Sequence, residues 1–530
     1  MNPDLESEMG HAWASTCRIL LGDEIGELGK YENYLKKYVE PVVLRNSEIS
    51  GNAVALGDDR FCKDAKFISS DEADFISGQS DPKPLSLNEI KDIDSIAAAL
   101  RERFVYSGNL LLGNCRNIEC SHRCSNSFSV KNSQDVSDSK YVAYSYGLRF
   151  CESAFGCSFA GEAKFGIKST QFSQSARCME VILTMNCSDC YYTANMQACQ
   201  QCIFSFNQKN RNYLIGNLPL PKEKYLQFKS SLMEQIRNEL ESKKNVLSIQ
   251  ELLGAMPWGQ ENGKSTLQTP SSPSLPAPQK EVEASFQSTT AVLFGKRLTG
   301  IFAYSKWLSE HVPLPIPAKS SKSGARIFIV PLFAYSSWFS SMVSFDEAWA
   351  LGKNAITPAQ AGTLSLSNAQ KSLEIIAYST SELRMLDNSN VVACANYYSA
   401  VNCYHGTYYA AKNSGFSFFA REVENVFGCD KILYSKFCLK CHHSYNLVRC
   451  FEVSDSLSCS DCYFCHNVEN CQECLFCFNV KSKRYAIGNV EYPKEYYLII
   501  KKLLLSEISS KIEKNKGLGL NIFNICEKAH

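Results

Sequence analysis

The sequence predicts a mainly β fold containing two duplicated β-solenoids of the right-handed type, each capped by a C-terminal amphipathic α-helix, with small accessory α/β segments. Three observations lead to this prediction: an internal repeat, a three-residue phase of small uncharged residues, and a 12-residue spacing of cysteines. Together they describe short coils that stack, because each coil repeats the inward side chains of the coil before it.

The first observation is an internal duplication. The segment CSDCYYTANMQACQQCIFSFNQKNRNYLIGNLPLPKEKY (187–225) aligns without a gap with CSDCYFCHNVENCQECLFCFNVKSKRYAIGNVEYPKEYY (459–497). Farther upstream the alignment pairs Cys115 with Cys394 at a larger offset, so the first copy carries a short insertion. Two copies emerge, at about 85–225 and 364–497.

The duplication divides the chain into seven segments. A stretch rich in Pro, Ser and Gly between the copies has the composition of a flexible linker. The related sequences FAYSKW (302–307) and FAYSSW (333–338) are predicted to be strands. The segments are an N-terminal accessory segment (1–84), the first solenoid (85–217), its capping helix (218–250), the linker (251–290), an aromatic-rich accessory segment (291–363), the second solenoid (364–490), and a capping helix with tail (491–530).

The second observation is a phase of three residues. Every third residue from Cys115 to Ser205 is uncharged, although about six or seven of these 31 positions would be charged by chance. The 24 positions from Ala411 to Val480 behave in the same way. A period of three fits neither a helix nor a plain strand, but it fits a narrow tube whose short sides each turn one small residue inward. Cys403 is out of phase with Ala411, so a shift of register is expected near 404–410.

The third observation is the 12-residue spacing of the cysteines, which predicts four triplets per coil. Cysteine behaves as a small hydrophobe, and Val453 and Val468 occupy the same phase, so these thiols are expected to fill the tube. The cysteines predicted to point inward are Cys178, Cys187, Cys190, Cys199, Cys202, Cys429, Cys438, Cys441, Cys450, Cys459, Cys462, Cys465, Cys471, Cys474 and Cys477.

Both copies end with the same predicted cap. Pro221 and Pro493 suit the first turn of a helix. Tyr225 and Tyr497 begin apolar stripes with helical spacing, which predicts amphipathic helices packed on the last coil.

The closing motif N-x-K-x-x-x-Y-x-I-x-N with P-K-E-x-Y, after a C-x-x-C-x-x-C ladder, resembles a family of uncharacterised cysteine-rich repeat proteins of small-genome prokaryotes. The resemblance covers both copies, about half of the chain, and implies no activity. Members of that family often carry zinc-binding-like cysteine clusters before the ladder, whereas the segment 1–84 of this chain contains only Cys17 and Cys62. The matching residues are Asn207, Lys209, Tyr213, Ile215, Asn217, Pro221, Lys222, Glu223 and Tyr225, and Asn479, Lys481, Tyr485, Ile487, Asn489, Pro493, Lys494, Glu495 and Tyr497.

Buried reduced thiols are the favoured interpretation of the ladders, with disulfides between coils, bound zinc or another thiophilic metal, and a redox cysteine as alternatives. A repeat of four triplets produces C-x-x-C spacing without any metal. His442, His443 and His466 follow inward cysteines and are predicted to lie in surface turns. The candidate zinc ligands are Cys438, Cys441, Cys459, Cys462, Cys465, Cys471, Cys474 and Cys477, with His442, His443 and His466 beside them.

Composition favours a non-enzymatic structural or interaction protein. The net charge of +1 gives no bulk attraction to nucleic acid, and no Walker, dinucleotide or G-x-S-x-G motif is present. The expected partners are other proteins or further copies of the chain, with nucleic acid only as part of a virion or ribonucleoprotein particle. A zinc-storage protein is the alternative, and a solenoid enzyme of the acyltransferase or carbonic-anhydrase type is weaker. No leader or membrane span is recognised, so a cytoplasmic protein without a cofactor is expected.

Overall fold

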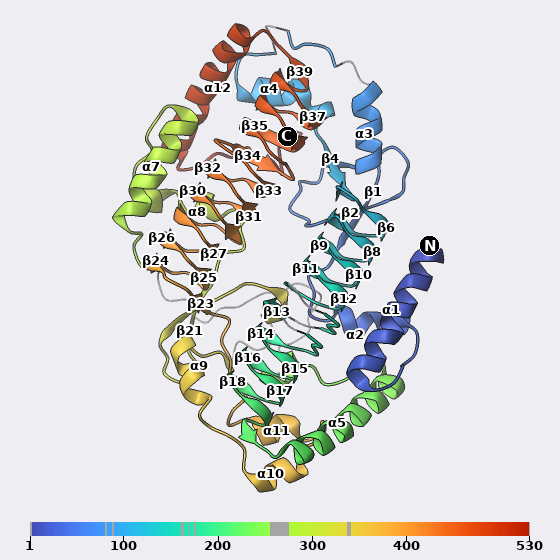
Figure 1. Cartoon of the computed structure of the whole chain (residues 1–530). Helices are drawn as coiled ribbons and strands as arrows, with labels where there is room; N and C mark the ends of the chain where they lie inside the picture. The colour runs from blue at the N-terminus through green and yellow to red at the C-terminus, as the bar shows by residue number, and fades with distance from the viewer. Residues whose placement is uncertain are drawn as a thin grey trace.

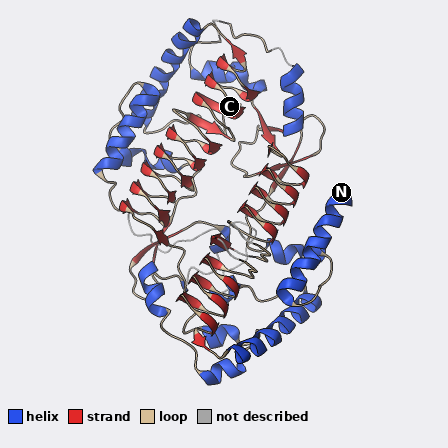
Figure 2. Ribbon diagram, in the orientation of Figure 1, coloured by secondary structure: helices blue, strands red, loops and turns tan. Residues whose placement is uncertain are grey.

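Short strands and flanking helices make up the computed structural model (Figure 1, Figure 2). Most strands pair in parallel and form two ladders, with the longest helices along the outer flanks. The strand-rich fold predicted from the sequence is therefore observed. The residues described are 3–79, 82–86, 89–159, 161, 164–168, 170–173, 176–254, 275–335 and 341–528.

The second ladder is a single sheet of 17 strands. Strands stack one coil apart, as in the pairs Cys462–Cys474 and Val468–Val480, and only the last pairing is antiparallel. The strands are β23 (Leu383–Met385), β24 (Ser389–Val392), β25 (Asn396–Tyr398), β26 (Val401–Tyr404), β27 (Tyr408–Tyr409), β28 (Lys412–Gly415), β29 (Ala420–Arg421), β30 (Glu424–Phe427), β31 (Asp430–Leu433), β32 (Lys436–Leu439), β33 (His442–Tyr445), β34 (Phe451–Ser454), β35 (Ser460–Glu469), β36 (Gln472–Leu475), β37 (Phe478–Lys481), β38 (Arg484–Ile487) and β39 (Val490–Glu491).

The first ladder is built in the same way. Its strands form four sheets of four strands each, most successive strands lie in different sheets, and residues such as Cys190 and Cys202 again pair from one coil to the next. The strands are β5 (Leu111–Leu112), β6 (Arg116–Glu119), β7 (His122–Ser125), β8 (Phe128–Lys131), β9 (Gln134–Ser137), β10 (Lys140–Ala143), β11 (Tyr146–Arg149), β12 (Glu152–Phe155), β13 (Thr170–Ser173), β14 (Ile182–Met185), β15 (Ser188–Tyr191), β16 (Ala194–Gln197), β17 (Gln200–Ile203), β18 (Phe206–Lys209), β19 (Asn212–Ile215) and β20 (Leu218–Pro219).

A left-handed residue at every third position explains the period of three. The backbone φ angle is positive at each third residue through 117–159, 186–213 and 413–485. Each such residue makes a corner, and the residue after it points inward. Left-handed conformations cost roughly 1–2 kcal/mol per residue outside glycine, so stacking must stabilise them. Asn467 and Asn479 lie at such corners one coil apart, and the amide Nδ2 of Asn467 donates to Oδ1 of Asn479 at 3.0 Å.

The predicted register shift in the second copy is confirmed. Val401 pairs with Lys412, and Cys403 with Ser414, so this coil is one residue shorter than its neighbours. The coil that follows has the usual length, because Tyr408 pairs with Ala420. The one-residue deletion moves the inward phase from Cys403 to the series that contains Ser414.

The capping helices are α5 (Lys222–Lys243) and α12 (Lys494–Asn515), preceded by Pro221 and Pro493 as predicted. Each contacts the last long strand of its ladder, β19 or β38. Tyr225 and Tyr497 are fully buried, as expected for stripes that cover an open end.

A second helix runs along each ladder beside its cap. Helix α1 (Pro3–Leu21) contacts β6, β8, β10, β12 and α5, and α7 (Lys280–Phe294) contacts β26, β28, β30, β32 and α12. Each is followed by short helices. These are η1 (Leu28–Tyr31) and α2 (Glu32–Lys36) after α1, and η3 (Ile301–Tyr304) and α8 (Ser305–Ser309) after α7.

The remaining elements form two arms that cross between the ladders. The first arm contacts β37 and α12 of the second ladder, and the second arm contacts β18 of the first ladder. Each arm therefore lies on the last coils of the opposite ladder (Figure 1). The first arm contains β1 (Val43–Asn46), β2 (Ala53–Leu56), β3 (Lys66–Ser69), α3 (Ser70–Gln79), α4 (Ile93–Leu100), η2 (Arg101–Arg103) and β4 (Val105–Gly108). The second contains β21 (Ile316–Lys319), β22 (Arg326–Ile329), η4 (Phe333–Tyr335), α9 (Phe345–Leu351), α10 (Pro358–Thr363) and α11 (Ala369–Leu373).

Two sequence predictions about the connecting regions are wrong. FAYSKW is helical, in η3 and α8, and the described part of FAYSSW is the helix η4, because their aromatic residues pack from helical turns. The linker predicted over 251–290 overlaps α6 (Ile249–Leu253) and α7, where Val282 and Phe286 are fully buried. The rest of the proposed linker, 255–274, lies outside the described residues.

Within the described part of the chain, no helix combines the length and apolar character required to span a lipid bilayer.

Candidate functional site: a charged network between the ladders

The cysteines predicted to point inward lie inside the two ladders, each at most 3% exposed. Their Sγ atoms lie near backbone oxygens: Cys462 Sγ is 3.4 Å from the oxygen of Ser460 and 3.7 Å from that of Cys471. Burial raises the pKa of the Cys403 thiol to about 12. The thiols thus occupy a wall of backbone carbonyls, where a protonated thiol can donate a weak hydrogen bond.

The candidate zinc ligands belong to the same columns as valines. Cys465 pairs in register with Val453, and Cys474 pairs with Cys462. Among the residues that the structure describes, no group of three or more His, Cys, Asp or Glu side chains is placed to hold a metal ion. None of the 25 cysteines, all of which lie among the described residues, forms a disulfide in the structure.

The prediction that three histidines lie in surface turns is wrong. His442, His443 and His466 are 0%, 4% and 1% exposed. They do lie outside their own ladder, but there the first arm covers His443 and His466, and Phe523 of the C-terminal tail packs on His442. A one-dimensional phase distinguishes inside from outside a tube, and it carries no information about what packs on the outside.

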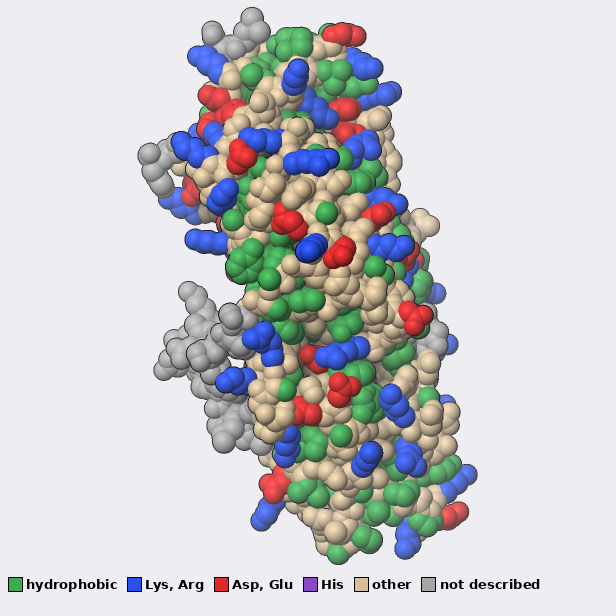
Figure 3. Space-filling model, turned by 90° about the vertical axis from the view of Figure 1, so that its left-hand side faces the viewer, with side chains coloured by type: hydrophobic (Ala, Val, Ile, Leu, Met, Phe, Trp, Pro, Cys, Tyr) green, Lys and Arg blue, Asp and Glu red, His purple; other side chains and the backbone are tan. Residues whose placement is uncertain are grey.

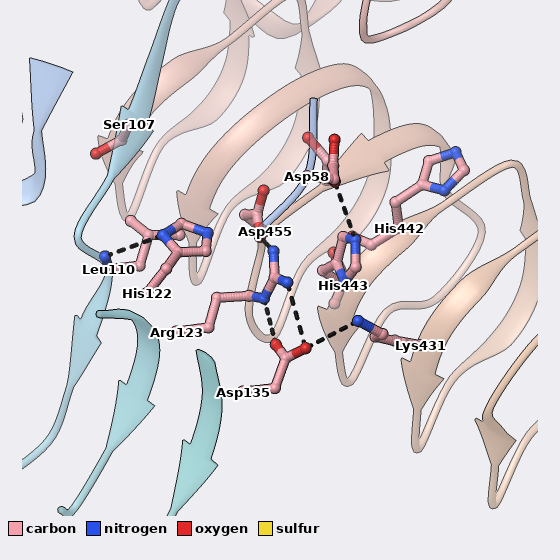
Figure 4. Close-up of polar contacts among 12 residues, drawn as sticks. Asp58, Ser107, Leu110, His122, Arg123, Asp135, Lys431, His442, His443 and Asp455 are labelled. Carbon is pink, nitrogen blue, oxygen red and sulfur yellow. Dashed lines mark hydrogen bonds and ion pairs between the residues drawn. The ribbon is translucent and has the colours of Figure 1, made fainter. Parts of the chain in front are cut away.

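Five corner residues from the two ladders meet in this covered region (Figure 4). They are Arg123 and Asp135 of the first ladder and Lys431, His443 and Asp455 of the second. Arg123 forms ion pairs with Asp135, one coil further along the first ladder, and with Asp455 of the second ladder, at 3.3 Å. Lys431 of the second ladder lies 2.8 Å from Asp135. Burial would raise the pKa of Asp135, but Arg123 and Lys431 hold it well below its usual range.

The first arm adds a second group of charges. Arg60 lies 2.8 Å from Asp58 and 3.2 Å from Asp430 of β31. His443 Nε2 is 2.8 Å from the guanidinium of Arg60 and 3.4 Å from Asp58. The arm is therefore attached to the second ladder by charged groups as well as by its apolar side chains.

His466 is held by the arm as a neutral imidazole. The backbone N–H of Ser107 in β4 donates to its Nε2 at 3.0 Å, so the proton belongs on Nδ1, which lies 2.8 Å from Ser454 Oγ. Burial lowers the pKa of His466. In the same way burial, with Arg123 beside it, lowers the pKa of His122 to about 3.

The contacts between the ladders run in opposite directions along the two corner columns. Arg123 meets Asp455 near one end of the contact, and Phe159 stacks on Phe419 at a centroid distance of 4.2 Å near the other. Between them, Lys431 lies 4.4 Å from the ring centroid of Tyr146. The ladders therefore lie side by side and antiparallel.

This network joins parts of the chain and leaves little access for a substrate. Arg123 and Asp455 side chains are 10% and 7% exposed. Two cavities among the described residues lie elsewhere: an open one of about 410 Å³ beside Lys280 and Phe302, and one of about 90 Å³ beside Cys526. The geometry is suited to fixing the ladders relative to one another.

Sequence reasoning did not find this network, although part of a signal is present. Arg123 and Asp135 are one coil apart at corners, and Lys431, His443 and Asp455 form another corner column. A search for charged residues spaced by one coil would have found both columns. It would not have found that they face each other.

Comparisons with protein-family models, with curated proteins and with solved structures find no match.

Proposed function

We propose that the two ladders are duplicated β-solenoids of the right-handed type, and that the protein is a non-enzymatic scaffold for other proteins or for further copies of itself. The observation that carries this proposal is the network of Arg123, Asp135, Lys431 and Asp455, which joins the two antiparallel ladders through largely buried ion pairs. Solenoids present long regular faces, and such faces commonly serve binding to other proteins.

A joint repeated in both halves supports the duplication. A buried lysine and glutamate stand one coil apart, at 3.3 Å in the first half and 3.9 Å in the second. In both halves the glutamate accepts a backbone N–H from the segment after the capping helix. The residues are Lys168, Glu180 and Ile249 in the first half and Lys440, Glu452 and Ile522 in the second.

The surface supports protein partners over nucleic acid. On the side where α7 and α12 lie, basic, acidic and apolar side chains are interspersed (Figure 3). Ile499 and Leu503 of α12 are 69% and 52% exposed. Nucleic-acid binding typically uses a concentrated basic surface, whereas mixed charge around apolar residues is common in contacts between proteins.

Elemental analysis and thiol titration of the purified chain test the scaffold against a zinc-thiolate protein. We expect far less than one zinc per chain, about 25 titratable thiols after denaturation, and an unchanged melting temperature after chelation. Several tightly bound zinc ions per chain, with a large loss of stability on chelation, would contradict the scaffold. Light scattering of the same sample reports self-association.

A further inference from the structure

Two cysteines outside the ladders lie together although they are far apart in the chain. Cys62 is in the first arm, between β2 and β3, and Cys526 is in the tail after α12; their Sγ atoms are 3.3 Å apart. The backbone N–H of Cys62 donates to the oxygen of Phe523 at 3.0 Å, and that of Lys528 donates to Asp64 at 3.0 Å. The pair is therefore flanked on both sides by hydrogen bonds between the first arm and the tail.

The pair differs from the ladder thiols in access. Cys62 is partly exposed, while Cys526 is 3% exposed but lines a cavity of about 90 Å³. Three cations, Lys66, Arg101 and Lys528, line this cavity together with Asp64 and Glu102. Ladder thiols such as Cys462 and Cys474 are enclosed by stacked coils and are fully buried. Because Cys62 is partly exposed, a small reagent can reach it without opening a ladder, and the three cations lie on the side of its neighbour Cys526.

We propose that Cys62 and Cys526 form a reversible disulfide site that exchanges with small anionic disulfides of the glutathione class. The thiolate of Cys62 attacks one sulfur of the reagent, which breaks the reagent's S–S bond and releases one thiolate. Cys526 then attacks Cys62 Sγ, releases the second thiolate and gives its proton to a departing thiolate. The cysteine pair is oxidised by two electrons, and the reagent is reduced to two thiols.

The required movement is small. A disulfide has an S–S length near 2.05 Å, so the sulfurs must approach by about 1.2 Å. The product would tie the first arm to the tail of the second half. Under the proposed duplication, the corresponding positions of the other joint are Tyr335 and Leu253, both buried in one apolar cluster. Of these two corresponding contacts, only the one between the first arm and the C-terminal tail would then be redox-sensitive.

The test treats the folded full-length chain with oxidised glutathione, blocks free thiols and maps peptides by mass spectrometry without reduction. We expect a peptide pair linked through Cys62 and Cys526, loss of two thiols per chain, and slower amide hydrogen exchange in 521–528. Dithiothreitol should reverse all three changes.

Variants separate this site from general oxidation. Cys62→Ser should abolish the linked peptide and leave exchange in 521–528 unaffected by glutathione. Cys120→Ser, which removes another partly exposed thiol, should leave the linked peptide unchanged. Oxidation of enclosed ladder cysteines such as Cys462 and Cys474 before the pair, or glutathione that stays on Cys62 without transfer to Cys526, would overturn the proposal.

Discussion

Two arginine–aspartate pairs share one local design and differ in their surroundings. Arg123 pairs with Asp135, and Arg449 pairs with Asp461 at 2.6 Å, in each case between corner residues one coil apart. The side chain of Arg123 is 10% exposed and that of Arg449 is 42% exposed. The difference is that the opposite ladder covers Arg123 and adds Asp455. The same arginine–aspartate spacing therefore helps to join the two ladders at Arg123, whereas at Arg449 it forms an ion pair on a solvent-exposed corner.

The largest expected loss of stability comes from removing Arg123, the arginine of the less exposed pair. Arg123→Met leaves Asp135 and Asp455 buried with less positive charge around them. We expect the free energy of unfolding to fall by about 3–5 kcal/mol, the typical effect of breaking a buried ion pair. Urea titration followed by circular dichroism measures it. A loss below about 1 kcal/mol, as for an exposed pair, would contradict the role assigned to the network.

The stability contributed by the region around Arg123 should also depend on pH, because the neighbouring His122 is buried. The folded pKa of His122 is about 3 against 6.5 in the unfolded chain, so its stabilisation is complete above pH 6.5 and is lost as pH falls toward 3. As pH falls from 6.5 to 5, the free energy of unfolding of the parent should therefore decrease by about 2 kcal/mol more than that of the His122→Gln variant. Urea titration at the two pH values measures this difference. Its neighbours Arg123, Asp135, Asp455 and His443 are unchanged in the variant.

The parent's absolute pH dependence has opposing contributions, so the difference is the relevant measurement. Burial raises the pKa of Glu452 to about 7, and this group makes the fold more stable as pH falls from 7 toward 4.5. Glu452 is present in both proteins and cancels in the comparison. Parallel curves for parent and variant between pH 6.5 and 5 would show that His122 is not held neutral.

Inside the ladder, size should matter and thiol chemistry should not. Cys462→Leu adds volume to a fully buried column and should cost about 1–3 kcal/mol. Cys462→Val places the residue found at Val453 and Val468 into the same phase and should cost less than about 1.5 kcal/mol. Urea titration of both variants gives the contrast. Equal, large losses for both would instead indicate a specific need for the thiol.

The exposed pair should give the smallest effect. Arg449→Met removes an ion pair at a solvated corner and should change the free energy of unfolding by less than about 1 kcal/mol. The change should shrink further in about 1 M salt, because exposed charges are screened. An effect comparable to that of Arg123→Met would remove burial as the explanation of the difference.

The sequence was informative wherever structure depends on local spacing. The pairing of successive coils, the shortened coil after Val401, the buried cysteine columns and the helices after Pro221 and Pro493 all follow from distances along the chain. A left-handed corner and a small inward residue recur within each triplet, so the pattern repeats many times along the sequence and can be recognised there.

The network was out of reach because its partners are distant in the chain. Arg123 meets Asp455 332 residues later, and His443 meets Arg60 383 residues earlier. No periodicity relates an arm to the ladder that it covers. The phase of three places the histidines outside their own ladder and carries no information about what packs on them there. The sequence FAYSKW has no periodicity that distinguishes a strand from a short helix, and Trp307 and Tyr304 pack from short helical turns.

The crossing of the arms has a consequence for synthesis on the ribosome. The last coils of the first ladder are covered by the second arm, where the amide of Asn217 donates to the backbone oxygen of Asn354, 137 residues later. At about 5–20 residues per second, that partner emerges roughly 7–30 seconds after Asn217. During this interval α5 can already cap the first ladder, but the surface of its last coils that the second arm covers is exposed. We expect the nascent chain to bind chaperones that shield exposed surface until the second arm has been synthesised.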